Sequence, residues 1–368
     1  MRPTMVSCLL ALACSSAAAE KPVPWTSCLR QKPAWYATAD ALRIADNVLL
    51  YQRADGGWPK NIDMAAKLDA KAVARLRNDK GRHDSIIDNG ATYTQMRYLA
   101  KVYAATRAER FRQSFLRAMV LLLRTQYPTG GWPQQLIRPS GYQRHITFND
   151  GAMIGVMSLL RDVAAGKPDF AFVGAKGRRA AARAVEKGVE CILRCQIRVK
   201  GTLTAWCAQH DARTLEPRPA RSYEKASISG GESVGIVGFL MELDHPSPAV
   251  VEAVQGAVAW FEAAKLTGIR QVTKRDPAKP RGLDKVIIKD PDAPPLWARF
   301  YEIGTNRAIF CSRDGIIRYS IAEISHERRT GYAWYGTWPA RLLTHDYPAW
   351  QKRWAPGNNV LKPAQKRR

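Results

Sequence analysis

Apolar residues recur at three- and four-residue steps along most of the chain, which is the period of an amphipathic helix. The clearest stretch, WYATADALRIADNVLLYQ, spans residues 35–52. The same period predicts further helices at 90–105, 108–126, 151–164, 176–198, 232–243 and 248–266. Strict alternation of apolar and polar residues is rare, and DKVIIKD at 284–290 is the best candidate strand. The pattern therefore predicts a mainly α-helical protein.

Long loops separate the predicted helices in pairs, and each long loop carries one tryptophan. Trp58 lies in QRADGGWPK and Trp132 lies in QYPTGGWPQ, 74 residues later. Another 74 residues on lies Trp206, in GTLTAWCAQ, a copy that lacks both Gly-Gly and Pro. A fixed spacing of this kind indicates an internal repeat, here of three helical hairpins.

Three hairpins cannot bury their apolar faces singly, so we expect them to pack as a ring, an (α/α)₃ toroid. Long loops alternate with short links, which places all the long loops at one end, where function usually lies. The stretch 270–345 is rich in Pro, Asp and basic residues and predicts an irregular extension with a strand or two. We expect one toroid domain over 20–345, including this extension, and a basic tail over 346–368.

The first 19 residues, MRPTMVSCLLALACSSAAA, have the layout of a secretory signal: one Arg, a short apolar run and small residues. This predicts a secreted or periplasmic protein. A buried N-terminal segment and a lipid-bearing Cys14 are the alternatives. No apolar run approaches the roughly 18–20 residues of a membrane span.

The chain is strongly basic, with 57 Lys and Arg against 32 Asp and Glu, a net charge of +25. Loss of Arg2 with the signal would leave +24. Such a charge predicts a polyanionic partner, either nucleic acid or an acidic polysaccharide, and an export signal favours the polysaccharide. Surface solubility alone is the third interpretation. The five cysteines after the signal have no zinc-site spacing, so we expect mostly free, buried thiols.

An acidic residue precedes the second helix of each hairpin. The strings are IIDNGATYTQM with Asp88, TFNDGAMIGVM with Asp150 and ISGGESVGIVG with Glu232. Acids at these positions commonly cap helices, and Ser229 with Glu232 has the form of a capping box. Asp88, Asp150 and the adjacent Asn89 could instead supply oxygen ligands for Ca²⁺. Sequence leaves both interpretations open.

Two basic strings follow. PRPARSYEKASISGGES contains Arg221 and Lys225, and GTNRAIFCSRDG contains Arg307 and Arg313. In so basic a chain a lone Arg is most often a surface residue, but Gly and Asn around Arg307 predict a turn that fixes its direction. We expect Arg307, Lys225 and Arg313 to contact an acidic ligand.

Six ordered strings together resemble the pectate lyases of polysaccharide lyase family 10, over about residues 35–345. They are YQRADGGWPKNIDM, IIDNGATYTQMRYLAKVY, GGWPQ, ITFNDGAMIGVM, QHDARTLEPRPARSYEKASISGGESVGIV and FYEIGTNRAIFCSRDG. The resemblance implies an (α/α)₃ toroid and calcium-dependent cleavage of polygalacturonate by anti β-elimination, which yields 4,5-unsaturated oligogalacturonides.

The resemblance also implies residue roles. Arg221 would be the catalytic base and Arg307 would bind a substrate carboxylate. Asp88 and Asp150 would surround Ca²⁺ and substrate, and Asn89 would join them as a ligand. The resemblance implies no role for Lys225, although a lysine is on general grounds an easier base than an arginine, which hardly ever loses its proton.

Two other functions remain compatible with the sequence. Asp88 and Asp150 could serve as the general acid and base of an inverting glycoside hydrolase. Alternatively, the chain could be a non-catalytic, basic polyanion-binding protein. No RRM, KH or helix-turn-helix signature supports nucleic-acid binding. We expect a monomer acting on an acidic polysaccharide.

Overall fold

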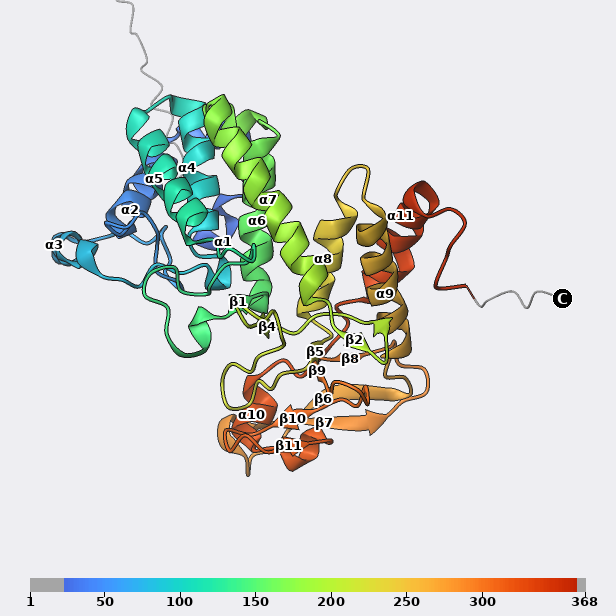
Figure 1. Cartoon of the computed structure of the whole chain (residues 1–368). Coiled ribbons are helices and arrows are strands. Elements are labelled where there is room, and N and C mark those ends of the chain that lie inside the picture. The colour runs from blue at the N-terminus through green and yellow to red at the C-terminus, as the bar shows by residue number, and fades with distance from the viewer. Residues whose placement is uncertain (1–22, 363–368) are drawn as a thin grey trace, which may run out of the picture.

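Helices make up about half of the described part of the chain, residues 23–362 of this computed structural model (Figure 1). Their bounds are α1 Trp25–Cys28, α2 Ala39–Tyr51, α3 Ala70–Asn78, α4 Tyr93–Thr106, α5 Glu109–Thr125, α6 Ala152–Ala164, α7 Ala175–Cys195, α8 Glu232–Met241, α9 Pro248–Ala263, α10 His326–Gly331 and α11 Tyr347–Trp354. The predicted mainly α-helical class is confirmed. The expected signal segment, 1–19, lies outside the described residues.

The long helices lie in two rows. In one row α4, α6 and α8 pack side by side, and in the other α2, α5, α7 and α9 do so. Helices joined by short links, such as α4 and α5 or α6 and α7, pack against each other across the rows. Figure 1 shows the rows running from α2 and α4 on one side to α8 and α9 on the other. The three hairpins of the expected toroid are present, and their helices do not close into a barrel.

A glutamine ends each of three outer helices and ties it to the next one. Gln52, Gln126 and Gln196 are the C-cap residues of α2, α5 and α7. Each side-chain amide donates one hydrogen bond into its own loop and one to the next outer helix, at 2.8–3.0 Å. The accepting carbonyls belong to Gly56 and Ser114, to Gly130 and Ala184, and to Thr204 and Ala253.

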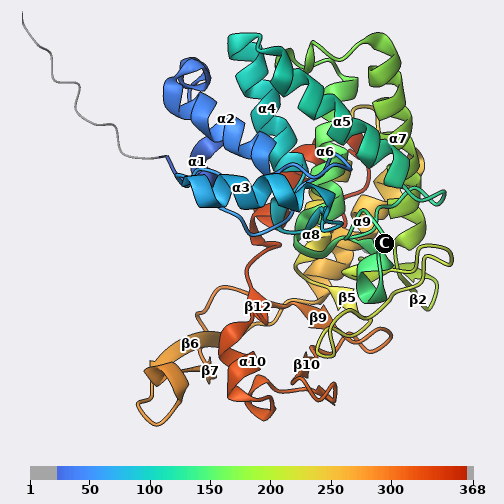
Figure 2. The ribbon, with the colours of Figure 1, turned by 90° about the vertical axis from the view of Figure 1, so that its left-hand side faces the viewer.

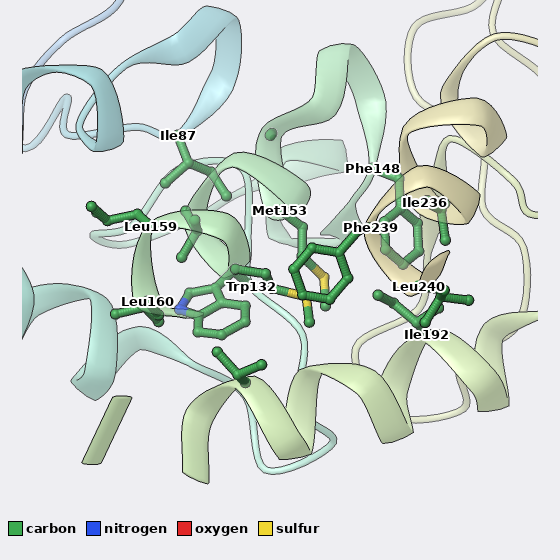
Figure 3. Packing of buried hydrophobic residues seen from close by; sticks show 14 of the residues in the cluster. Ile87, Trp132, Phe148, Met153, Leu159, Leu160, Ile192, Ile236, Phe239 and Leu240 are labelled. Atoms are coloured by element: carbon green, nitrogen blue, oxygen red, sulfur yellow. The ribbon is translucent and has the colours of Figure 1, made fainter. Parts of the chain in front are cut away.

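The three loop tryptophans make the same contacts in each repeat. All three side chains are fully buried. The indole N–H of Trp58, Trp132 and Trp206 donates to a carbonyl near the end of the preceding helix, at 2.7–2.8 Å. Figure 3 shows Trp132 packed among apolar side chains such as Leu159 and Leu160. The internal repeat is thus confirmed, even for Trp206, whose loop lacks Gly-Gly and Pro.

Two glycines are required where the loops cross the next outer helix. Gly56 has φ +105°, and a Cβ there would lie 2.9 Å from the carbonyl oxygen of Arg117. Gly130 has φ +99°, and a Cβ there would lie 2.0 Å from that of Lys187. Any larger residue would be strained and would push the loop off the helix.

Short strands connect the loops to one another and to the C-terminal part. The strands are β1 Ile146–Thr147, β2 Arg198–Val199, β3 Thr202–Leu203, β4 Gln209–His210, β5 Ile228–Ser229, β6 Ile269–Arg275, β7 Leu283–Lys289, β8 Trp297–Ala298, β9 Phe300–Tyr301, β10 Phe310–Cys311, β11 Ile317–Arg318 and β12 Tyr335–Gly336. β1 pairs with β4, and β5 pairs with β9, all antiparallel.

The C-terminal extension has strands, as its sequence predicts. β6 and β7 form an antiparallel hairpin, which confirms the strand expected at 284–290. A second, smaller apolar cluster, which includes Phe300, Phe310 and Trp334, holds the extension together. Figure 2 shows this part beneath the helical layer, joined to it through β9 and β12.

The expected basic tail begins later than residue 346. The helix α11 follows a π-helical turn, η9 Leu342–Asp346, and buries Tyr347 and Trp350 in the main core. Only the last residues of the tail lie outside the described part. The five cysteines of the described part are all buried and free, as expected. Among the described residues, no helix is long and apolar enough to cross a membrane.

Replacing Gln196 by Met tests the contribution of the glutamine bonds to stability. The change keeps the length of the side chain but removes both donated hydrogen bonds and leaves the loop carbonyl of Thr204 without a donor. We expect a loss of about 2–4 kcal/mol of unfolding free energy. Gln113→Met, at an exposed position of α5, is the matched control and should change stability by less than about 0.5 kcal/mol. Thermal or urea unfolding measures both, and equal effects would contradict the structural role.

Candidate functional site

The long loops enclose a small polar cleft at their shared end of the helical rows. Figure 1 shows them gathered below the helices, around β1, β4 and β5. The cleft is lined by Lys60, Asp88, Asn89, Gln134, Tyr142, Asn149, Asp150, Gln209, Arg221 and Glu224. The structure therefore brings together Asp88, Asn89, Asp150 and Arg221, four of the residues singled out from the sequence.

Two equivalent turns carry the acidic residues of the first two repeats. The turns are η3, Asp88–Gly90, and η5, Asn149–Gly151. Their middle residues, Asn89 and Asp150, both adopt left-handed backbone, with φ of 51° and 50°. Asn and Asp tolerate this conformation better than other residues with a side chain. The first turn buries its acid, Asp88, and the second exposes its acid, Asp150.

The capping interpretation does not hold for these two acids. Neither α4 nor α6 has a side-chain hydrogen bond at its N-cap, and their N-cap residues are Thr92 and Gly151. In the third repeat, the Ser229 hydroxyl accepts hydrogen bonds from the backbone N–H groups of Gly231 and Glu232. The Glu232 carboxylate instead contacts the Ser229 hydroxyl and an arginine, so only half of the capping box forms.

Three buried oxygen atoms of the cleft have no hydrogen-bond donor among the described residues. They are Asp88 Oδ1, Gln134 Oε1 and Gln209 Oε1. The other oxygen of Asp88 pairs with the Lys60 ammonium. Buried acceptors are almost always satisfied, so three orphans in one cleft mark a place for a bound cation, a water or another hydrogen-bond donor. Carboxylate and amide oxygens are the ligands that Ca²⁺ prefers.

The protein provides only part of a full calcium coordination shell. Within residues 23–362, no cluster of three or more His, Cys, Asp or Glu side chains could hold a metal ion. Ca²⁺ takes six to eight oxygen ligands, and amides, waters and ligand carboxylates can all supply them. The orphaned oxygens, together with Asp150 and Asn89, fit a site that a bound acidic ligand would complete.

Arg299 is the most buried cation beside the cleft, and sequence analysis missed it. Its Nη2 donates to Asp150 Oδ1 at 3.1 Å and to Asn149 Oδ1 at 3.3 Å. It also forms a close ion pair with Glu232. Burial disfavours its charge, but the carboxylates of Glu232 and Asp150 raise the pKa of Arg299 above its ordinary value. Its string, LWARFYEIG, has no local signal that would distinguish it from other arginines of this basic chain.

Arg221 is held in the cleft by Glu224, which was also missed. The Arg221 Nε donates to Glu224 Oε2 at 2.7 Å, and its Nη2 pairs with Oε1. The Tyr332 hydroxyl donates to the same carboxylate at 2.7 Å. The hydrogen bond to Glu224 raises the pKa of Arg221 above its ordinary value. Burial alone would raise the pKa of Glu224, but the bonds from Arg221 and Tyr332 lower it. Arg221 is therefore fully charged in this arrangement.

Three basic residues expected near the ligand do not line the cleft. Arg307 is exposed and stacks on Tyr319, with its guanidinium carbon 3.4 Å from the ring centroid. Arg313 pairs with Glu327 at 3.0 Å and lies 5.6 Å from the centroid of Tyr223. The guanidinium of Arg221 lies 5.0 Å from the same centroid, so one ring separates Arg313 from the cleft.

Lys225, the third of these residues, points toward another loop. Its ammonium lies beside Gly315, where an added Cβ would come within 3.1 Å of it. In the described part of the chain it forms no ion pair. Lys225 is therefore not among the residues that line the cleft.

Comparison with known protein families assigns the chain to one of them. The family model for pectic acid lyases matches residues 52–343, which include every residue of the cleft lining. The chain belongs to the pectic acid lyase family. The resemblance carried by the six sequence strings is thereby confirmed.

Solved structures agree with this assignment. A mutant of a family 10 polysaccharide lyase from Cellvibrio cellulosa, in complex with trigalacturonic acid, is 33% identical, with a TM-score of 0.74. The match covers 88% of this pectic acid lyase and 95% of that chain. Another structure of the Cellvibrio cellulosa lyase is 34% identical over 88% of this chain and 94% of its own, with the same TM-score. No curated protein matched significantly.

The ion pair of this pectic acid lyase predicts a pH-dependent contribution to stability. Because the folded-state pKa of Glu224 is lowered, its contribution is present above the unfolded-state value near 4.5 and is lost as pH falls through the folded-state value. We expect Glu224→Gln to lose about 2 kcal/mol at neutral pH and progressively less as the pH falls below 4.5.

Thermal unfolding of wild type and variant between pH 3 and 8 measures this difference. Glu216→Gln is the control, because Glu216 is exposed and its removal should shift stability little at any pH. A stability difference for Glu224→Gln that stays constant down to pH 3 would contradict the coupling to Arg221.

Proposed function

We propose that the protein is a calcium-dependent pectate lyase that cleaves polygalacturonate by anti β-elimination in the cleft between its long loops. Family membership gives the reaction class. The observation that carries the calcium dependence is the set of orphaned oxygens of Asp88, Gln134 and Gln209 beside Arg221. The alternatives of a glycoside hydrolase and of a non-catalytic binder have no support from the family assignment.

The chemistry explains why such a cleft needs positive charge. β-Elimination removes the proton at C5 of a galacturonate, next to its carboxylate, and expels the glycosidic oxygen at C4. The proton is weakly acidic, because the carboxylate is already negative. A bound Ca²⁺ would supply charge neutralisation at that carboxylate. Asp88, Asp150 and Asn89, with the amide oxygens of Gln134 and Gln209, are the groups that would hold it.

Arg221 is the proposed base, positioned by its neighbours. Glu224 engages Nε and Nη2, which leaves Nη1 as the guanidinium nitrogen available to a substrate. Tyr332 holds Glu224 in turn. The raised pKa of Arg221 opposes loss of its proton, so the base role requires that bound cation and substrate weaken the pair with Glu224. Lys225 has the more suitable amine but does not line the cleft.

The remaining proposals concern binding and location. Three basic residues lie outside the cleft lining: Arg307, Lys225 and Arg313. A polymer that extends beyond the cleft would pass close to the basic surface to which they belong. We propose that the protein acts as a monomer and that residues 1–19 direct its export, since its polymeric substrate lies outside the cell.

An absorbance assay tests the proposed activity. The 4,5-unsaturated product absorbs in the ultraviolet, so polygalacturonate incubated with the protein and Ca²⁺ should gain absorbance, and a chelator should abolish the gain. Arg221→Ala should lower the rate by about 10²- to 10⁴-fold. Lys225→Ala should stay within a few-fold of wild type. Near-normal turnover by Arg221→Ala would overturn the assignment of the base, and reducing ends without absorbance would indicate a hydrolase.

Asp150→Ala tests the calcium site separately. Loss of this oxygen ligand should raise the Ca²⁺ concentration that gives half-maximal activity by about 10- to 100-fold. Asp169→Ala is the control, since Asp169 pairs with Lys101 on the helical face, away from the cleft. Calorimetric titration of Ca²⁺ in the presence of trigalacturonate gives a reading independent of turnover. An unchanged calcium affinity in Asp150→Ala would remove this residue from the site.

A further inference from the structure

A second groove adjoins the cleft on the side of the first repeat. It has a volume of about 390 Å³, and its walls include Trp25, Asn61, Asp63 and Gln95. Lys60 and Asn89 line both this groove and the cleft. The two spaces are therefore neighbours that share part of their lining.

The shared wall has a defined geometry. Asn89 Nδ2 donates to Asn61 Oδ1 at 2.8 Å, which links the left-handed turn of η3 to the loop after Trp58. Asn61 itself has φ +60°. The Lys60 ammonium reaches the buried carboxylate of Asp88 from the groove side. One face of this wall thus belongs to the proposed calcium site, and the other face belongs to the groove.

Trp25, at the start of α1, provides a fixed aromatic surface in the groove. Its ring meets Tyr98 edge to face at 5.3 Å between centroids and 69° between planes. Its backbone N–H lies 3.4 Å from Asp63 Oδ1. The side chain remains partly exposed, and it lines the groove. An aromatic ring held in this way can stack on a flat apolar ligand face without a large loss of side-chain entropy.

The groove's chemistry fits a sugar. The amides of Asn61 and Gln95 can bond to hydroxyl groups, and the Lys60 ammonium, already paired with Asp88, stands in the lining that the groove shares with the cleft. Asp63 is the opposing charge in the groove, but its Oδ1 accepts from the backbone N–H groups of Trp25 and Ala65. A partly exposed ring with two amides beside it gives an apolar surface and hydrogen-bonding groups for one sugar residue.

We propose that this groove is a distal subsite that binds a galacturonate unit of the chain being cleaved, with Trp25 as its stacking platform. The inference rests on the proposed lyase function. Trp25 precedes residues 52–343, the part that matches the family model, so the platform belongs to this chain's own N-terminal segment. The subsite makes cleavage more efficient for chains long enough to reach it.

The test compares two tryptophans that have similar structural roles. Trp35 also packs against Tyr98, at 6.3 Å, and is partly exposed, but it does not line the groove. For each variant, kcat/KM is measured with hexagalacturonate and with trigalacturonate under saturating Ca²⁺. Trp25→Ala should lower the ratio of hexamer to trimer kcat/KM about five- to tenfold. Trp35→Ala should leave the ratio unchanged, and Trp25→Phe should restore part of it.

The outcomes separate the subsite from the proposed function. Equal losses for both substrates in Trp25→Ala, or the same change of ratio in Trp35→Ala, would overturn the subsite. Thermal midpoints of all three variants identify a loss that comes from folding. If the wild type forms no unsaturated product from either substrate, the proposed lyase function fails. In that case, binding of hexagalacturonate weakened by Trp25→Ala but not by Trp35→Ala would still support the groove as a binding site.

Discussion

The side-chain amide of a helix-ending glutamine, used three times, is the interaction on which the rest of this structure depends. Each outer helix concerned ends at one of three glutamines, Gln52, Gln126 or Gln196. Both hydrogens of the glutamine amide are donated to carbonyl groups, one in the following loop and one in the next outer helix. An unsatisfied carbonyl in that interior would be costly, so the spacing of neighbouring helices and the exit direction of each loop are fixed together. The buried tryptophan then anchors the same loop to the helix it has just left. All three long loops consequently leave at one end, and the cleft forms where they meet.

The repeat also explains how the cleft acquires different groups from one backbone geometry. The turns η3 and η5 share a left-handed middle residue, yet one reads Asp-Asn-Gly and the other Asn-Asp-Gly. Exchange of the two residues moves the carboxylate from the buried first position of the turn, Asp88, to the exposed middle position, Asp150. The third repeat has no such turn, because α8 begins at Glu232 itself, and that carboxylate pairs with Arg299 instead. Duplication thus supplied the scaffold, and small substitutions at equivalent positions supplied the chemistry.

Sequence predicted the features that are periodic or local, and it missed the features that depend on distant partners. The helices, the hairpins and the shared end of the loops follow from apolar spacing and from the 74-residue repeat. Asp88, Asn89, Asp150 and Arg221 stand in recognisable strings, and they do meet in the cleft. Arg299 and the orphaned glutamines carry no local pattern, since Arg299 contacts Asp150 across 149 positions of the chain. The same limitation explains why Arg307, Arg313 and Lys225 were expected near the ligand. A short sequence motif shows that a basic residue lies in a turn, but only tertiary packing decides in which direction that turn points. It also explains why α11 was predicted to be part of a basic tail, because its aromatic residues stand in an otherwise basic segment.

The charge of the cleft differs in sign from the charge of the whole protein, and this contrast bears on how a polyanion is admitted. The chain carries +25, whereas the lining holds two cations, Lys60 and Arg221, against three carboxylates, Asp88, Asp150 and Glu224, which gives a formal −1. The surface field can gather an acidic polymer from a distance, but it is screened over about 8–10 Å of saline, so the local groups decide what enters. With a net charge of −1, the lining repels a uronate carboxylate. A divalent cation on the orphaned oxygens would change the sum to +1 and attract it. Bound calcium would then be needed for substrate entry as well as for the acidity of the C5 proton. The ion pairs of Lys60 and Arg221 would be free to rearrange around the bound carboxylate only after the net charge of the lining has become positive.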